Sequence, residues 1–404
     1  MASIDDVERL IEEEEEEFGR PIQHPKRPPK RKIPPTLETL LVRDQDRTLR
    51  RTGLNLEQFN SVLSLLEAEA IPSKRGPKLP DLGLRLVIML QWLRFGPTYK
   101  ELADAYSMSA GRIQTAITSL WDPLCKVLSE TLLPRKPRDY RPTRTFKNFP
   151  NAIGALDATL IATVKPADRE ENDAWFSGKH QSHGAKLQVL SAPDGTVIHF
   201  GGIIPGRRND KYLFDQSDIP RALSQTITND NGLQVIVRPP ILVDGGYQGI
   251  HETYPEAIMP HRRPPHGQLT PAQKHENTLI SQDRVVVEQF FGRLKKSWRI
   301  IRHPYRGDRD SIETLAKILV CLTNLKLKTE PLYAEEEPYE PFPEIEEELE
   351  ESNTTLDGCN SVNDSQNSPI ICKEHRIISM KNSMNKRSRS SQRSQTVGKT
   401  GGKH

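Results

Sequence analysis

The sequence has only four cysteines and no long apolar run, and each of these absences excludes a class of protein. Cys125, Cys321, Cys359 and Cys372 are far apart and form no CxxC pair. This spacing argues against a disulfide framework or a zinc site and fits a reducing compartment. No apolar run reaches the roughly 18 residues that a transmembrane helix needs. The N-terminus is acidic, unlike the basic and then apolar pattern of a secretory signal peptide.

Apolar residues are also scarce for a chain of this length, at 35%, and the 404 residues include 32 prolines. We therefore predict that both ends are disordered, over residues 1–50 and 331–404. The first end contains an acidic block, Glu12–Glu17, and a basic proline-rich run, Pro25–Lys32. Such a basic run is typical of a nuclear localisation signal, of a DNA-gripping arm or of a plain solvated linker. The last end is acidic and then rich in Ser, Lys and Arg, which is typical of disorder.

The net charge of +3 is unevenly distributed along the chain. Residues 51–145 and 146–330 are net basic, whereas both ends are net acidic. A basic folded part indicates a polyanionic partner such as nucleic acid. Ordinary scatter of charge along the chain is the alternative explanation.

Residues 51–145 show helical periodicity and are predicted to form an all-α domain. Leu82–Arg94 is strongly apolar and is expected to be a core helix. Tyr99–Leu120 is typical of a helix-turn-helix, in which Ser109 caps the second helix. On that second helix, Arg112 and Gln114 are predicted to face outward, where they could contact a major groove or phosphates. A helical pair without any contact to DNA would show the same pattern.

A proline-rich and basic linker, Pro134–Pro150, separates this domain from a second one at residues 146–330. Ile153–Thr163 is an apolar strand that carries Asp157 in its middle. Asp-Gly at 194–195 lies between two alternating segments and predicts a hairpin. Ile241–Tyr247 is a second apolar strand, which stops at two glycines and places Asp244 at its carboxyl end. These elements and the helix Gln282–Arg299 predict a mixed sheet covered by helices, an α/β fold.

Three carboxylates recur in this domain, two on strands and one on the last helix. Asp157, Asp244 and Glu288 would suit a site for two divalent metal ions. A lone helical glutamate is more often part of a surface pair, here with Arg284 one turn earlier, worth only about 0.2–0.5 kcal/mol. Basic residues around Glu288 favour a phosphate-facing surface instead.

Five segments in this order resemble the DDE-superfamily endonucleases of Harbinger-type transposable elements and their bacterial insertion-sequence relatives. The resemblance covers roughly residues 80–330. Each motif is weak alone, but the five together, in the family's order, are a strong signal. The segments are GALDAT (154–159), WFSGKHQSHGAKLQVLSAPDG (175–195), PGRRND (205–210), LVDGGYQG (242–249) and RVVVEQFFGRLKKSWRII (284–301).

The resemblance implies an RNase H-like fold with a helix-turn-helix before it. It also implies that Asp157, Asp244 and Glu288 are the three catalytic, metal-binding acids of the family. Asp210 matches a further acid in the PG…D segment, and its role stays open. Ala158 and Thr159 depart from the residues that follow the first acid in many relatives, but none of the three acids is replaced. Eukaryotic relatives often need a separate Myb-like DNA-binding partner, so such a partner is also expected.

Phosphodiester cleavage explains why such acids would be needed. Two Mg²⁺ (or Mn²⁺) ions about 3.5–4 Å apart can activate the attacking oxygen and stabilise the leaving one. Mg²⁺ prefers carboxylate oxygens and water. We expect phosphate contacts to make DNA binding strongly dependent on salt. The expected DNA-binding residues, on the helix-turn-helix and around the acids, are Arg112, Gln114, Lys179, Lys186, Arg207, Arg208, Lys295 and Arg299.

Four histidines in the second domain offer an alternative metal chemistry. His180, His183, His199 and His251 suggest zinc, but their spacing and the lack of cysteine partners favour histidines that face solvent or DNA.

The leading functional prediction is a DNA transposase that cleaves and joins strands at element ends. The alternatives are a host-recruited DNA-binding regulator that keeps the fold, and an RNA-processing nuclease. We expect a homo-oligomer without membrane association, in the nucleus of a eukaryotic host or in the cytoplasm otherwise. The charged tails favour a eukaryotic host.

Overall fold

The computed structural model describes residues 45–69, 79–228 and 233–333, all within one compact unit, 1–342. Most of the two predicted disordered ends therefore lies outside the described residues. Within the described ranges, no helix is long and apolar enough to span a bilayer. Cys125 and Cys321 are both free thiols. The other two cysteines lie outside the described residues.

The first part of the chain is helical, as predicted. Within residues 45–69 and 79–132, the helices are α3 (Gln45–Thr52), α4 (Leu56–Ala68), α5 (Leu82–Phe95), α6 (Tyr99–Tyr106), α7 (Ala110–Thr118) and α8 (Trp121–Leu132). Helix α5 matches the expected core helix closely, beginning at the Asp81 cap and ending at Gly96 in the left-handed conformation.

Helices α6 and α7 form the pair predicted in this region. Ser107 ends α6 in the left-handed conformation, and the Ser109 hydroxyl accepts a hydrogen bond from the Arg112 N–H at the start of α7. Ile113 and Ile117 are fully buried. The local geometry is therefore as expected, whereas its use as a DNA-binding helix-turn-helix stays a prediction.

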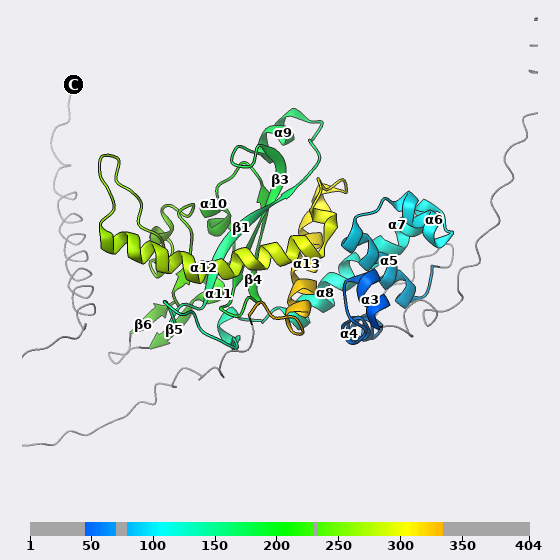
Figure 1. Ribbon diagram of the computed structural model, residues 1–404, viewed down its shortest axis with the longest axis horizontal. Helices are drawn as coiled ribbons and strands as arrows, with labels where there is room; N and C mark the ends of the chain where they lie inside the picture. Colours follow the sequence, from blue (N-terminus) through cyan, green and yellow to red (C-terminus); the bar gives the residue numbers. More distant parts are fainter. Residues whose placement is uncertain (1–44, 70–78, 229–232, 334–404) are drawn as a thin grey trace, which may run out of the picture. The chain divides into compact units, whose positions relative to one another are not determined.

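A curled mixed sheet follows, with flanking helices, which is consistent with the RNase H-like fold that the resemblance implies (Figure 1). The order of its strands is β2-β3-β1-β7-β8, and β4 pairs with β3. β1 is antiparallel to β3 and parallel to β7. The strands are β1 (Gly154–Ala162), β2 (Phe176–Ser177), β3 (Ser182–Ser191), β4 (Val197–Pro205), β7 (Ile241–Leu242) and β8 (Ala257–Ile258).

The β3–β4 hairpin turns where Asp-Gly predicts it. Gly195 has a φ of +91°, a backbone conformation that would be strained for any residue with a side chain. The Asp194 carboxylate accepts hydrogen bonds from the Thr196 N–H and from the hydroxyl of Tyr140. Tyr140 lies in the expected linker, so part of this linker packs on the sheet domain.

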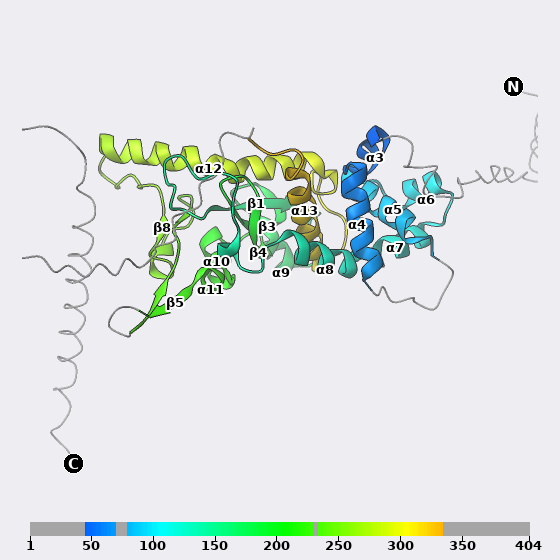
Figure 2. The same ribbon diagram turned by 90° about the horizontal axis from the view of Figure 1, so that it is seen from below.

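Helices lie on both faces of the sheet (Figure 2). The remaining helices are α9 (Arg169–Trp175), α10 (Asp210–Gln216), α11 (Ile219–Leu223), α12 (Pro271–Ser297) and α13 (Ile312–Leu327). Helix α12 lies over β1, whereas α10 contacts β3 and β4. Short 3-10 helices occur at Pro137–Asp139, Ile250–Glu252, Arg299–Ile301 and Arg309–Ser311. A separate two-stranded ribbon is formed by β5 (Gln225–Thr228) and β6 (Gln234–Val237).

Helix α12 contains most of the expected helix Gln282–Arg299 and begins further upstream, at a proline that suits the first position of a helix. Pro271 is its first residue, and the Thr270 hydroxyl and the Gln273 side chain form a capping box there. Val287, Phe291, Leu294 and Trp298 recur at helical spacing and are all buried. This stripe fixes which face of α12 turns towards the sheet.

The helical part and the sheet share one apolar core, although two separate domains were expected. The core extends from Leu54 to Leu327, because α13 packs on both α8 and β4. Asn324 of α13 is buried at this seam. Its amide accepts from the Val197 N–H at 3.0 Å and donates to the Val197 and Leu132 carbonyls at 2.8 and 3.2 Å.

Candidate active site

The pairing of β1 with β7 brings two of the predicted acids together. Gly154 pairs with Ile241 and Ala155 with Leu242, in parallel. Continued by two residues, the same register places Asp157 level with Asp244. The site therefore lies at the carboxyl end of β7, where open α/β sheets place their ligands.

Asp157 lies on the face of the sheet that α12 covers. Its carboxylate accepts the Ala158 N–H at 2.8 Å and lies 3.6 Å from the Arg284 guanidinium of α12. Burial raises the pKa of Asp157 to about 6, and the negative charges of Asp244 and Asp210 add to the rise. Arg284 and the Ala158 N–H oppose it. The site thus concentrates negative charge that its own cations only partly neutralise.

Asp244 lies two residues beyond the end of β7, where the chain turns at Gly245 and Gly246. Its Oδ1 accepts the Gly246 N–H at 2.7 Å. A Cβ at Gly246 would lie 2.9 Å from Asp244 Oδ1 and 3.2 Å from Asp210 Oδ2. The second glycine therefore leaves open the space between these two carboxylates.

Asp210 is the acid whose role the sequence left open. It is the first residue of α10 and is buried, and its Oδ1 accepts from Lys186 Nζ of β3 at 2.8 Å. Burial raises the pKa of Tyr247 well above its usual range, and the charges of Asp157, Asp210 and Asp244 raise it further. The charges of three aspartates therefore act on this one buried tyrosine.

Glu288 is the predicted acid that stands apart from this group. It is exposed, and among the described residues it makes no hydrogen bond or ion pair. Arg284 pairs with Asp157 rather than with Glu288, so the simple helical surface pair is not formed. In the described part of the chain, no three His, Cys, Asp or Glu side chains converge closely enough to hold a metal ion.

Glu288 nevertheless lies on the side of α12 that meets β1. Arg284, one turn before it, contacts Asp157, and Lys295, two turns after it, donates to the Thr159 hydroxyl at 2.7 Å. Residues four and seven apart lie on one helix face. The side chain of Glu288 therefore starts between two contacts to the strand that carries Asp157.

The expected DNA-binding residues divide into two groups. Six are exposed, namely Arg112, Gln114, Lys179, Arg207, Arg208 and Arg299. The other two are buried or half-buried. Lys295 is half-buried, with its pKa lowered by burial, and bonds Thr159.

Lys186 requires a correction. It is buried and paired with Asp210, so it is not the exposed phosphate contact that we expected. The cause is the strand register. Lys186 stands opposite Leu160 and Gln188 opposite Ala158, which turns both side chains towards α10 and away from solvent.

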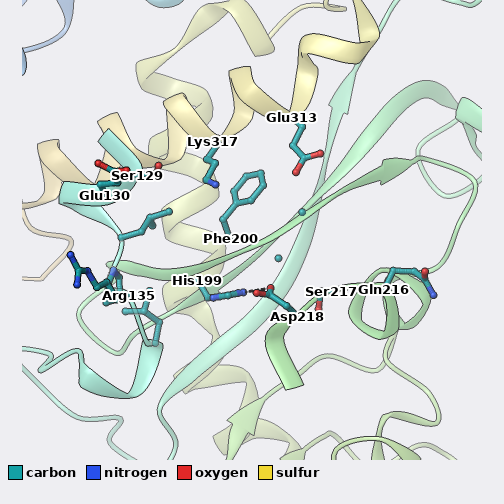
Figure 3. A pocket seen from close by; sticks show the side chains of 15 residues that line it. Ser129, Glu130, Arg135, His199, Phe200, Gln216, Ser217, Asp218, Glu313 and Lys317 are labelled. Atoms are coloured by element: carbon teal, nitrogen blue, oxygen red, sulfur yellow. Dashed lines mark hydrogen bonds and ion pairs between the residues drawn. The ribbon is translucent and has the colours of Figure 1, made fainter. Parts of the chain in front are cut away.

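Two of the four histidines make side-chain contacts, each with a different partner. His183 bonds the Asn172 side chain, and His199 lies 2.8 Å from an Asp218 oxygen. His199 lines a cavity of about 670 Å³ between α8, β4 and α13, shown in Figure 3. None of the four acids discussed above lines this cavity. The cavity and the acidic site are therefore distinct places on the fold.

Comparison with known proteins agrees with this geometry. Residues 156–324 match the family model described as DDE superfamily endonuclease. This region is a DDE superfamily endonuclease domain. A putative transposase for insertion sequence element IS112 of Streptomyces albus G is 27% identical over 256 residues, covering 62% of this chain and 84% of the relative.

A second relative extends the likeness. A probable transposase for insertion sequence element IS702 of Microchaete diplosiphon is 21% identical over 280 residues, 69% of this chain and 93% of its own length. No solved structure matches the chain. The DDE superfamily endonuclease domain contains all four acids, and both named relatives are described as transposases.

Proposed function

We propose that the protein is a DNA transposase that cleaves and joins phosphodiester bonds at element ends with two divalent metal ions. One observation carries the proposal. Asp157 on β1 stands level with Asp244 just beyond the end of the adjacent β7, and α12, which carries Glu288, contacts β1 through Arg284 and Lys295. The family match and the two transposase relatives support the same reaction class.

The residues fit divalent metal ions by their chemistry. All the acids offer carboxylate oxygens, the ligands that Mg²⁺ and Mn²⁺ prefer, and Gly246 keeps the space between two of them free. Bound there, such ions would supply an activated attacking oxygen and charge stabilisation at the leaving oxygen. Asp157, Asp244 and Glu288 would hold them.

The surrounding cations have roles of their own. Arg284 and Lys295 hold α12 against β1 and so fix the position of Glu288 relative to this strand. Arg207 and Arg208 are exposed on the loop just before Asp210. We assign these two arginines to phosphate contacts that orient the DNA strand at the acids. Arg112 and Gln114 on α7 are assigned to a separate stretch of duplex.

The decisive experiment incubates the protein with labelled duplex ends and Mg²⁺ or Mn²⁺. The wild type should cleave, whereas Glu288→Gln and Asp157→Ala should be inactive and still bind DNA. A fully active Asp157→Ala protein would end the proposal. Binding of duplex DNA without cleavage by the wild type would favour the regulator instead, and preference for RNA would favour an RNA-processing nuclease.

The proposed partners are duplex DNA, a second copy of the chain and a separate Myb-like DNA-binding protein. The nuclear location expected for a eukaryotic host stays a prediction, and both named relatives come from insertion sequence elements.

A further inference from the structure

Asp210 occupies a position that a carboxylate needs in order to share a cation with Asp244. Its Oδ2 and Asp244 Oδ1 both lie within 3.2 Å of the point where a Gly246 Cβ would stand. Both carboxylates also act electrostatically on Asp157. Two buried or half-buried carboxylates that face one small open space repel each other unless a cation lies between them.

The orientation of Asp210 is fixed by three elements. Helix α10 begins at Asp210 behind the Asn209 cap, which sets the backbone. Lys186 holds Oδ1 at 2.8 Å, and Gln188 of the same strand donates to the Asp210 carbonyl. One carboxylate oxygen is therefore committed to a lysine, and Oδ2 is left on the Gly246 side.

A second observation concerns Arg284 of α12, which faces the same group of carboxylates. Arg284 is buried and directs its guanidinium at Asp157, at 3.6 Å, a distance too long for a good hydrogen bond. Its Nε is buried without any hydrogen-bond partner. Because a guanidinium can only donate hydrogen bonds, this buried N–H requires a further acceptor oxygen, such as that of a phosphate or of a water bound to a cation.

We propose that Asp210 is a fourth metal ligand, whose Oδ2 binds the same divalent cation as Asp244, and that Lys186 is its positioning residue. This inference rests on the proposed function. It assigns to Asp210 a direct role that the three-acid pattern lacks. It also explains why a lysine is buried beneath the site rather than exposed to DNA.

The test measures Mn²⁺ binding to the full chain, by the electron paramagnetic resonance signal of free Mn²⁺, with no DNA present. Asp210→Asn should weaken binding by at least about tenfold, since even the loss of an outer-shell partner costs 10–100-fold. Asp215→Asn is the matched control, because Asp215 is also a lysine-paired aspartate of α10. It should bind Mn²⁺ like the wild type.

A double variant separates ligation from folding. Asp210→Asn leaves Lys186 buried and unpaired, which could loosen the fold by itself. Asp210→Asn combined with Lys186→Met removes this charge, and we expect recovery of the melting temperature without recovery of Mn²⁺ binding. If the double variant binds Mn²⁺ like the wild type, Asp210 is only structural and the inference is overturned.

The outcomes also separate this inference from the proposed function. Normal Mn²⁺ binding by Asp210→Asn, with loss in Asp157→Asn and Asp244→Asn, would refute the role of Asp210 and leave the nuclease intact. A wild type that binds no Mn²⁺ and cleaves no DNA would refute both.

Discussion

The two halves of the acidic site differ in how they hold charge. On the sheet side, Asp157 and Asp210 are largely removed from water, and each is held by a cation of a neighbouring element. On the helix side, Glu288 is exposed, and no other described residue holds it. Buried charge costs stability unless it is fully compensated. The sheet therefore holds buried carboxylates whose charge is only partly compensated. The helix adds an exposed carboxylate whose side chain can move to a ligand.

Glu288→Gln should separate activity from stability most sharply. We expect about a 1000-fold loss of DNA cleavage, equivalent to roughly 4 kcal/mol of transition-state stabilisation. Because the side chain is exposed, the free energy of unfolding should change by no more than about 0.5 kcal/mol. Cleavage of labelled duplex and urea unfolding are the two measurements.

Glu67→Gln on α4 provides the matched surface control and should alter neither quantity. A large loss of stability in Glu288→Gln would mean that the helix acid is as embedded as the sheet acids, and the contrast would disappear.

Asp157→Asn tests how much folding stability the protein loses when the buried Asp157 carboxyl ionises with rising pH. The pKa of Asp157 is about 6 in the fold, against 3.8 for an unburied carboxyl. Between these values the folded state binds the extra proton, so the stability contributed by neutral Asp157 is lost as pH rises towards 6. Each pKa unit corresponds to about 1.4 kcal/mol, so the full loss is on the order of 3 kcal/mol.

The measurement compares unfolding of metal-free wild type and Asp157→Asn between pH 4 and pH 8. The wild type should lose stability relative to the variant over this range. A difference that is constant with pH would show that Asp157 ionises like an exposed carboxyl.

Gly246→Ala tests the open space between the carboxylates. The added methyl would lie 2.9 Å from Asp244 Oδ1 and should displace that carboxylate. We expect cleavage and Mn²⁺ affinity to fall by about tenfold, equivalent to about 1.4 kcal/mol. Gly245→Ala is the control, because a Cβ there meets nothing within 4 Å. Equal effects of the two substitutions would show that activity depends on the conformation of the turn rather than on the open space between the carboxylates.

Thr159→Val gives the smallest expected effect. It removes the hydrogen bond from Lys295 that holds α12 to β1, which should destabilise the protein by about 1 kcal/mol. Thr278→Val on the exposed side of α12 removes only a bond to the Lys274 carbonyl and should change stability less. Denaturant unfolding of both variants decides whether the helix is held at this contact.

Local signals in the sequence predict a large share of the fold. The β3–β4 hairpin follows from Asp-Gly at 194–195, and the start of α12 from Pro271 behind its threonine cap. Helix α13 is harder to predict, because it is apolar nearly all round and shows no clear helical stripe. Its position between α8 and β4 is also the reason that the helical part and the sheet share a core.

The site was predictable only where a residue depends on its own segment. Asp157 lies within the apolar strand β1 and Asp244 lies just beyond the apolar strand β7, and each apolar segment is visible in the sequence. The parallel pairing of the two strands brings the acids level. The partner of Lys186 was not predictable, because it is Asp210, 24 residues away, and depends on which face of β3 turns inward. Strand register, which one sequence does not display, decides between a DNA contact and a buried support.

The side-chain amide of Asn324 links the helical part of the chain to the sheet. It ties α8, which follows directly on α7, to the β4 backbone through three hydrogen bonds. These hydrogen bonds resist hinge motion between the helical part and the sheet. The surface of α7 and the carboxylates would therefore stay at a fixed distance from each other. On the proposed function, duplex bound by α7 would be cut at a constant number of base pairs from the bound site. Asn324→Ala would then make the position of the cut variable before it lowered the rate of cleavage.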